Sequence, residues 1–128
     1  MKEKIKLFMK KLRKMPDFNR VKFVFLFGSY AYREPSKLSD IDFAVYHEGN
    51  DTERFKFRMR LLGNLPDNFD VQGFQDLSLY VSINILKGKL LYTDDEAFVY
   101  DQAYKLIKRF DDFKKYHEDY LESWPKII

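Results

Sequence analysis

The first fourteen residues carry hydrophobic side chains at the spacing of an α-helix. These apolar positions form one stripe, and they are Ile5, Phe8, Met9 and Leu12. The pattern predicts a helix over residues 2–14 that ends at Met15, because a residue before proline is pushed out of the helical region. Such a helix packs its stripe against a core and keeps its lysines in water, and a contact of those lysines with RNA or a membrane is the alternative interpretation.

Apolar runs further along the chain predict the strands of a sheet. Residues 21–27 are almost wholly apolar, which is typical of a central strand that is buried on both faces. Residues 41–46 alternate between two faces, and residues 69–74 form a third apolar run. Residues 90–92 are expected to form a short edge element.

A helix is expected between the second and third of these runs. It would cover residues 51–62, begin with Asp51 or Thr52 as its cap, and end before a polar turn that contains glycine and proline. Its apolar stripe is expected to consist of Phe55, Met59 and Leu62. The arginines and lysines between these positions are then expected to face water.

Two further helices are expected after the third run. One would begin at Asp76 or Ser78 and end near residue 86, before a lysine and a glycine. The other is long and runs from Asp94 or Asp95 to about residue 120. Its apolar positions include Phe98, Ala103, Leu106, Phe110 and Phe113.

This order of elements predicts an α/β (α+β) fold, in which helices pack against a short mixed sheet and a long helix ends the chain. The 128 residues fit a single domain over residues 1–128. We expect its core at about 20–93 and its C-terminal helix at about 94–124.

Composition narrows the class of protein. The chain has no cysteine, which excludes disulfides and thiolate metal sites, and we expect a cytoplasmic address. The charged N-terminus does not resemble a signal peptide, and no apolar stretch has the length of a membrane span. The net charge of +3 is too small to argue for nucleic acid, so we expect neither nucleic acid nor membrane as a partner.

Gly28 and Ser29 stand where the first apolar run ends. A backbone that leaves a strand and comes close to a phosphate has no room for a Cβ atom, which favours glycine. A serine next to it can donate hydrogen bonds from its hydroxyl and its amide to a phosphate oxygen. Alone, the pair is also compatible with an ordinary turn in which the serine caps a helix.

Asp40 and Asp42 come ten residues later, at the start of the second apolar run. They are two residues apart on a strand, so they share one face with Ala44, opposite Ile41, Phe43 and Val45. Two half-buried like charges are costly unless a cation compensates them, and Mg²⁺ prefers carboxylate, phosphate and water oxygens. The pattern therefore predicts a site for a metal-bound nucleoside triphosphate.

Asp70 is a third candidate carboxylate, because it lies early in the third apolar run. If that strand neighbours the strand of Asp42, its carboxylate can complete the metal site and can act as a base for an incoming hydroxyl. On its own this residue is equally compatible with a strand aspartate in solvent.

The joint pattern resembles the nucleotidyltransferase superfamily related to DNA polymerase β. The motif is Gly28-Ser29, ten residues, Asp40-Ile41-Asp42, and an aspartate on a later strand. The likeness spans about residues 20–93 and includes the segment of residues 85–92 that follows the third aspartate. The short length is similar to that of the minimal nucleotidyltransferases, the MNT or MntA-like proteins.

The resemblance implies roles for these residues. Gly28 and Ser29 would hold the triphosphate of ATP, while Asp40, Asp42 and Asp70 would bind Mg²⁺, with two ions expected. The reaction implied is attack of a hydroxyl on the α-phosphate of ATP, with loss of pyrophosphate. Members of the MNT family commonly act as antitoxins, and their partner is an all-helical HEPN toxin that is adenylylated on a tyrosine.

The chain departs from the family pattern after the serine. Many members read Gly-Ser-x-Ala-Arg-Gly, whereas here Tyr32 occupies the position of the arginine and Arg33 follows it. On a helix a shift of one residue rotates a side chain by about 100°, so Arg33 is a weak candidate for phosphate binding. The alternatives are an antitoxin that acts by occlusion, without transfer, and transfer of the nucleotide to a small molecule or RNA.

Two more features bear on partners and on the site. The last helix carries aromatic residues that could form a docking surface, and Trp124, Ile127 and Ile128 are the stronger candidates because they lie near or beyond its end. His47 follows the strand of the two aspartates, and we expect an exposed histidine in a turn.

Overall fold

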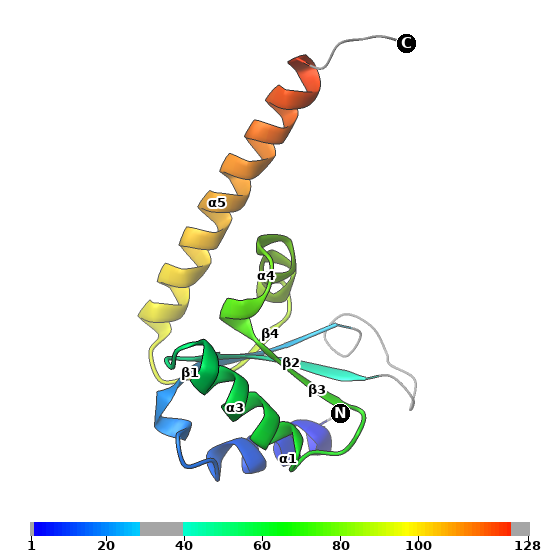
Figure 1. Ribbon diagram of the computed structural model, residues 1–128, viewed down its shortest axis with the longest axis vertical. Helices are drawn as coiled ribbons and strands as arrows, with labels where there is room; N and C mark the ends of the chain where they lie inside the picture. Colours follow the sequence, from blue (N-terminus) through cyan, green and yellow to red (C-terminus); the bar gives the residue numbers. More distant parts are fainter. Residues whose placement is uncertain (1, 29–39, 124–128) are drawn as a thin grey trace.

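The computed structural model of the chain describes residues 2–28 and 40–123 (Figure 1). Its helices are α1 (Lys2–Arg13), α3 (Asp51–Leu62), α4 (Leu79–Leu86) and α5 (Glu96–Ser123), with the short 3-10 helices η1 (Phe18–Arg20) and η2 (Phe74–Asp76). Its strands are β1 (Val21–Phe27), β2 (Ile41–His47), β3 (Phe69–Gly73) and β4 (Lys89–Thr93). The α-helices and strands agree with those expected from the sequence to within a few residues at their ends, whereas the two 3-10 helices were not expected.

The strands form one mixed sheet in the order β3-β2-β1-β4. β1 is antiparallel to both of its neighbours, whereas β2 and β3 are parallel. Since β1 has a neighbour on each side and is covered above and below, nearly all of its side chains are apolar and most are buried. The predicted class, helices packed against a short mixed sheet, is confirmed.

One side of the sheet, which we call the closed face, is covered by α1 and α3 (Figure 1). The side chains of Ile41, Phe43 and Val45 on β2 point to this side, where they meet the buried stripe of α1. The ring of Phe8 on α1 stacks on Phe43 with 3.7 Å between the ring centroids. The sequence prediction for α1 is therefore confirmed: its apolar stripe packs inward.

The other side, which we call the carboxylate face, carries α4 and α5 (Figure 1). An aromatic cluster fills the space between the sheet and these helices, and its buried members are Phe23, Phe25, Ala44, Phe74, Ile85 and Val99. Only the first part of α5 packs on this cluster. Beyond it the helix extends away from the sheet, with Phe113 and Tyr116 more than half exposed.

The cap of α3 differs from the sequence prediction. Its cap is Asn50, neither Asp51 nor Thr52: the Asn50 side chain accepts a hydrogen bond from the amide of Glu53 at 2.9 Å, and the Glu53 side chain accepts one from the amide of Asn50 at 3.0 Å. Ser78 caps α4, as one of the two expected alternatives.

The apolar stripe of α3 also differs from the prediction. Of the predicted stripe only Leu62 packs against the core, while Phe55 is 59% exposed and Met59 41% exposed; the buried residues are Phe57 and Leu61. Arg58 also contacts the sheet, because its Nε donates to the carbonyl oxygen of Val71 on β3. An arginine that was expected in water thus bonds to the sheet, next to the apolar side chains that pack on it.

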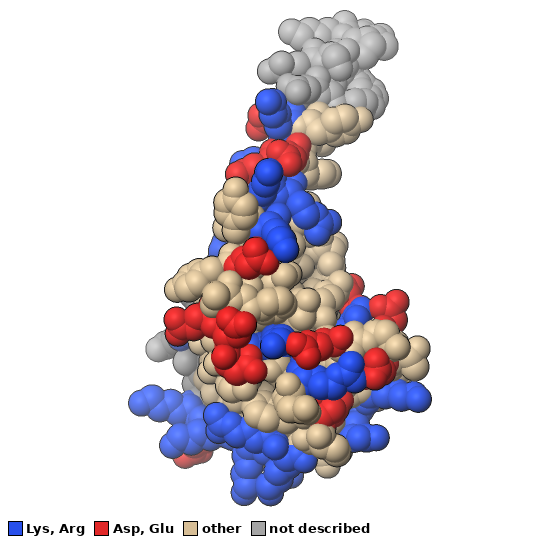
Figure 2. Space-filling view, turned by 90° about the vertical axis from the view of Figure 1, so that its left-hand side faces the viewer, with Lys and Arg blue, Asp and Glu red and all other residues tan. Residues whose placement is uncertain are grey.

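Charge is distributed unevenly over the surface. Figure 2 shows lysine and arginine side chains gathered at the end of the molecule where α1 and α3 lie, whereas both signs of charge are mixed along α5. Among the helices in the described part of the chain, none combines the length and the apolar composition that a membrane span requires.

Candidate active site

Two of the predicted carboxylates lie side by side on the carboxylate face. β2 and β3 run parallel, and their register places Asp42 opposite Asp70. Residues at the same register on parallel neighbours point to the same face of a sheet. Burial first, and then the nearby carboxylates of Asp70 and Asp40, raise the pKa of Asp42 to about 6. The pair therefore holds negative charge at a cost that a bound cation would remove.

Asp70 is oriented by a neighbour on its own strand. The side-chain amide of Gln72 donates a hydrogen bond to Oδ2 of Asp70 at 2.8 Å. One carboxylate oxygen is thus engaged within β3, and a carboxylate retains further acceptor sites on its second oxygen. Gln72 was not singled out in the sequence, although its position two residues after Asp70 places it on the same face.

Gly28 lies directly beside this pair. It follows Phe27, which is the register partner of Asp42 across β1 and β2. Its φ is 77°, a left-handed conformation that residues with side chains rarely adopt, and a Cβ atom there would lie 2.4 Å from Oδ2 of Asp42. The sequence predicted a glycine here to make room for phosphate. The structure gives a second reason for glycine at this position, because the Asp42 carboxylate occupies the space that a side chain would need.

The other predicted site residues are Asp40, Ser29 and Arg33. Asp40 is exposed and precedes β2 at the edge of the described region. Ser29 and Arg33 lie outside the described residues. Within residues 2–28 and 40–123, no three acidic, histidine or cysteine side chains stand close enough together to hold a metal ion. The structure thus brings together Asp42, Asp70 and Gly28.

The chemistry of this donor set fits Mg²⁺. Two carboxylates side by side, one of them with a raised pKa, supply hard oxygen ligands and an excess of negative charge. Mg²⁺ in phosphate-handling proteins commonly takes one or two carboxylates and completes its octahedron with phosphate oxygens and water. Asp42 and Asp70 are the residues that would hold it.

His47 corrects a sequence expectation, because it is buried with 2% of its surface exposed. Its Nε2 lies 2.8 Å from Oδ2 of Asp17, and its Nδ1 accepts a hydrogen bond from the amide of Gly49 at 2.9 Å. Since Nδ1 is an acceptor, the proton of the neutral ring resides on Nε2, facing Asp17. His47 lies on the closed face and ties the end of β2 to the segment after α1.

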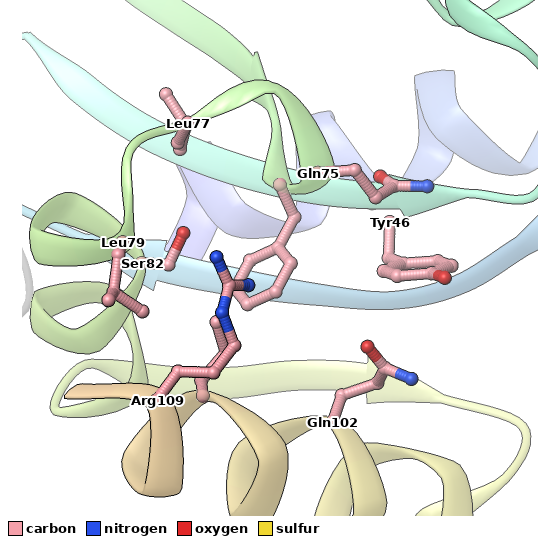
Figure 3. Close-up of a pocket in the computed structure, with 9 residues that line it drawn as sticks. Tyr46, Gln75, Leu77, Leu79, Ser82, Gln102 and Arg109 are labelled. Carbon is pink, nitrogen blue, oxygen red and sulfur yellow. The ribbon is translucent and has the colours of Figure 1, made fainter. Parts of the chain in front are cut away.

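A cavity of about 260 Å³ lies on the carboxylate face, between η2, α4 and α5 (Figure 3). Tyr46 lines it from β2, four residues beyond Asp42, or about 13 Å along the strand. Gln75, Gln102 and Arg109 also line it, and sequence reasoning singled out none of these residues. No spacing could have revealed them, because they come from segments far apart in the chain.

Comparison with known proteins places the chain in a family. Residues 3–97 match the family model described as polymerase beta, nucleotidyltransferase. A Methanocaldococcus jannaschii protein named "Putative protein adenylyltransferase MJ1547" is 33% identical over 92 residues, which cover 72% of this chain and 71% of the relative.

Solved structures share the fold at lower identity. A chain in the crystal structure of a toxin–antitoxin with AMP-PNP matches with a TM-score of 0.71 at 20% identity, covering 92% of this chain and 95% of that chain. A chain in the complex of a tri-AMPylated Shewanella oneidensis HEPN toxin with an MNT antitoxin matches with a TM-score of 0.69 at 20% identity, covering 94% and 95%. The family match and the fold together show that the chain belongs to the polymerase β nucleotidyltransferase family.

Proposed function

We propose that this nucleotidyltransferase transfers AMP from ATP to a hydroxyl group of a protein partner, a tyrosine of an all-helical HEPN-type toxin, and thereby acts as an antitoxin. The observation that carries the proposal is the pairing of Asp42 with Asp70 on parallel strands, directly beside Gly28. A half-buried carboxylate pair next to a glycine with a positive φ is suited to a metal-bound triphosphate and has no evident use in packing.

In this proposal Asp40, Asp42 and Asp70 hold two Mg²⁺ ions, and Gly28 and Ser29 hold the triphosphate. When bound, Mg²⁺ supplies positive charge to the triphosphate and to the leaving pyrophosphate. Arg33 is a weaker candidate for a phosphate contact. The hydroxyl oxygen of the acceptor forms a bond to the α-phosphorus, the bond from that phosphorus to the β-phosphate oxygen breaks, and the hydroxyl proton passes to Asp70.

A protein is the preferred acceptor for two reasons. The relative from Methanocaldococcus jannaschii is named as a protein adenylyltransferase, and chains of toxin–antitoxin complexes share the fold. The chain itself offers a protein-binding surface in α5, where Tyr100, Tyr104 and Tyr116 are each at least 66% exposed. Aromatic residues are enriched in protein interfaces. Trp124, Ile127 and Ile128, the other candidates for this interface, lie outside the described residues.

The test uses ATP labelled at the α-phosphate, Mg²⁺ and the HEPN-type partner or a lysate of the source cell. We expect a labelled protein band, and we expect Asp42→Asn to reduce the labelling rate by about 10³-fold, since metal charge supplies several kcal/mol to such a transition state. The matched control is Asp67→Asn, which removes an exposed carboxylate just before β3 and should label at the wild-type rate.

Neutralisation of the toxin is measured with the same proteins. If Asp42→Asn abolishes labelling yet still neutralises the toxin, the chain acts by occlusion and the catalytic proposal is wrong. Label found only in small molecules or RNA would move the acceptor to those classes. Circular dichroism of each variant separates a lost carboxylate from a lost fold.

A further inference from the structure

The cavity between η2, α4 and α5 is separate from the carboxylate pair. It lies at the end of β2 opposite to Asp42. The buried side chains of Phe25 and Ile85 fill the space between the sheet and α4. Its walls combine four apolar side chains with hydrogen-bonding groups and one cation. A binding cavity with a few convergent polar groups in an apolar wall is typical of small-ligand sites.

The polar groups of the cavity point to an anionic ligand. Arg109 is its one charged lining residue in the described part of the chain, and no carboxylate lines it there. In Figure 3 the Arg109 side chain rises from α5 toward α4 and the sheet. Arg109 makes no ion pair with any described residue, so its guanidinium keeps all of its donors for a carboxylate or phosphate.

The neutral groups of the cavity suit a heteroaromatic ring. The side-chain amides of Gln75 and Gln102 flank Tyr46 in Figure 3. Gln75 donates from Nε2 to the carbonyl oxygen of His47 at 2.5 Å, while its Oε1 is buried without a partner among the described residues. Since that oxygen is closed off from the cavity, Gln75 shapes the cavity wall, and the amide that a ligand would meet is that of Gln102. A glutamine amide such as that of Gln102 pairs with the edge of adenine, and the ring of Tyr46 offers a surface on which a base can stack.

We propose that this cavity binds a nucleoside 5′-monophosphate, with its phosphate at Arg109 and its base against Gln102 and Tyr46. A volume of about 260 Å³ lies at the lower end of small-molecule pockets and is too small for a folded segment of another protein. The inference goes beyond the proposed transfer reaction, because this site needs neither the aspartate pair nor Mg²⁺.

Isothermal titration calorimetry with AMP in the presence of EDTA tests the proposal, since a metal-dependent site is silent under these conditions. We expect saturable binding with Kd on the order of 100 µM, the range of a small ligand held by one charge pair and a few hydrogen bonds. Adenosine and inorganic phosphate, which each carry half of the recognised groups, should bind at least about tenfold more weakly.

Variants locate the bound AMP. Arg109→Gln should weaken binding about tenfold or more, and Gln102→Leu should weaken AMP binding while leaving the weak binding of phosphate unchanged. The matched control is Lys108→Gln, which removes an exposed cation from the same turn of α5 but does not line the cavity. The double variant Asp42→Asn/Asp70→Asn should bind AMP like the wild type, which separates this site from the proposed catalytic one.

Two results would overturn the assignment. The first is the absence of AMP binding up to millimolar concentration. If Arg109→Gln then also weakens binding of the protein partner, the cavity belongs to a protein interface. The second is AMP binding that survives Arg109→Gln and disappears in Asp42→Asn/Asp70→Asn, which would place the nucleotide at the carboxylate pair.

Discussion

The strand β2 presents different chemistry to the two sides of the sheet. Toward the closed face it sends Ile41, Phe43 and Val45, which are buried between α1 and α3. Toward the carboxylate face it sends Asp42, Ala44 and Tyr46, which pass from the aspartate pair through the aromatic cluster to the cavity at α5. On the closed face the strand is apolar until the buried His47 at its end, whereas the other side begins with a half-buried charge and ends with a phenol.

The difference between the two faces shows how a short chain can be stable while it carries a site that lowers its stability. Packing on the closed face contributes favourable burial, because its core side chains are removed almost entirely from water. The aspartate pair on the carboxylate face acts in the other direction, since it brings like charges together in a partly buried place. We therefore expect substitutions on the two faces to have effects of opposite sign on stability.

The largest effect is expected on the closed face. Phe43→Ala should lower the free energy of unfolding by about 3–5 kcal/mol, because Phe43 is fully buried and its removal leaves a cavity beside Phe8 and Phe69. Urea denaturation at pH 7.5 measures the change. Tyr46→Phe, on the other face of the same strand, is the control, and it should alter the unfolding free energy by less than about 1 kcal/mol. Equal losses for the two variants would remove the distinction between the faces.

The second effect has the opposite sign. Asp42→Asn should raise the free energy of unfolding by about 1–2 kcal/mol at pH 7.5 without metal, because it removes the charge that burial and Asp70 disfavour. Solvent screening of this partly exposed carboxylate keeps the gain below the full value of the pKa shift. The folded-state pKa of about 6 lies above the ordinary value of 3.8. The folded state therefore binds this proton more tightly, and the wild type loses stability as the pH rises from about 4 to 6.

The pH dependence makes this prediction specific. The advantage of Asp42→Asn should be largest above pH 6, should decline through pH 4, and should vanish at about pH 3 and below, where the carboxyl is protonated in both states. Thermal unfolding at a series of pH values in EDTA gives the comparison, with Asp67→Asn as the exposed control. A variant that is less stable than the wild type at pH 7.5 would show that the pair is held by favourable contacts.

The third effect is a loss of stability at Gly28, where the end of β1 meets Asp42. Gly28→Ala should cost about 1–2 kcal/mol of stability, because its left-handed φ disfavours a side chain and its Cβ would contact Oδ2 of Asp42. In an Asp42→Ala background only the backbone cost should remain, so a double-mutant cycle should show a coupling of about 1 kcal/mol. Gly63→Ala, at a helical φ and with no atom closer than 3.5 Å to the new Cβ, should be tolerated. Additive costs at residues 28 and 42 would contradict the close contact.

The chain sequence predicted the elements of this architecture but left their partners open. Alternation along residues 41–47 correctly separated the two faces of β2, because that pattern depends only on the strand period. The proximity of Asp42 to Asp70 depended on parallel pairing and on a register that no local pattern encodes. The family resemblance supplied that link.

The sequence predictions were wrong where two local arrangements fitted the pattern of residues equally well. The helix α3 carries two apolar sets on opposite sides, one with Phe55 and Met59 and one with Phe57 and Leu61, and only contacts with the sheet select between them. His47 was expected in water because it precedes a turn, yet Asp17, which lies 30 residues earlier, satisfies its buried ring. The cavity at Arg109 unites segments from β2 to α5, so it emerges only from the assembled fold.

The smallest effect on stability is expected where α5 leaves the carboxylate face. Tyr104→Ser replaces a side chain that is 66% exposed, so the free energy of unfolding should change by less than about 0.5 kcal/mol. Binding to the protein partner should nevertheless weaken by about tenfold, because exposed tyrosines often anchor interfaces. Urea denaturation and a pull-down titration with the HEPN-type partner measure the two quantities on one preparation. Lys105→Gln, one residue along the helix, is the control for charge and position. If both variants bind the partner like the wild type, this stretch of α5 is not the docking surface. The carboxylate face is then the next surface to test for partner binding.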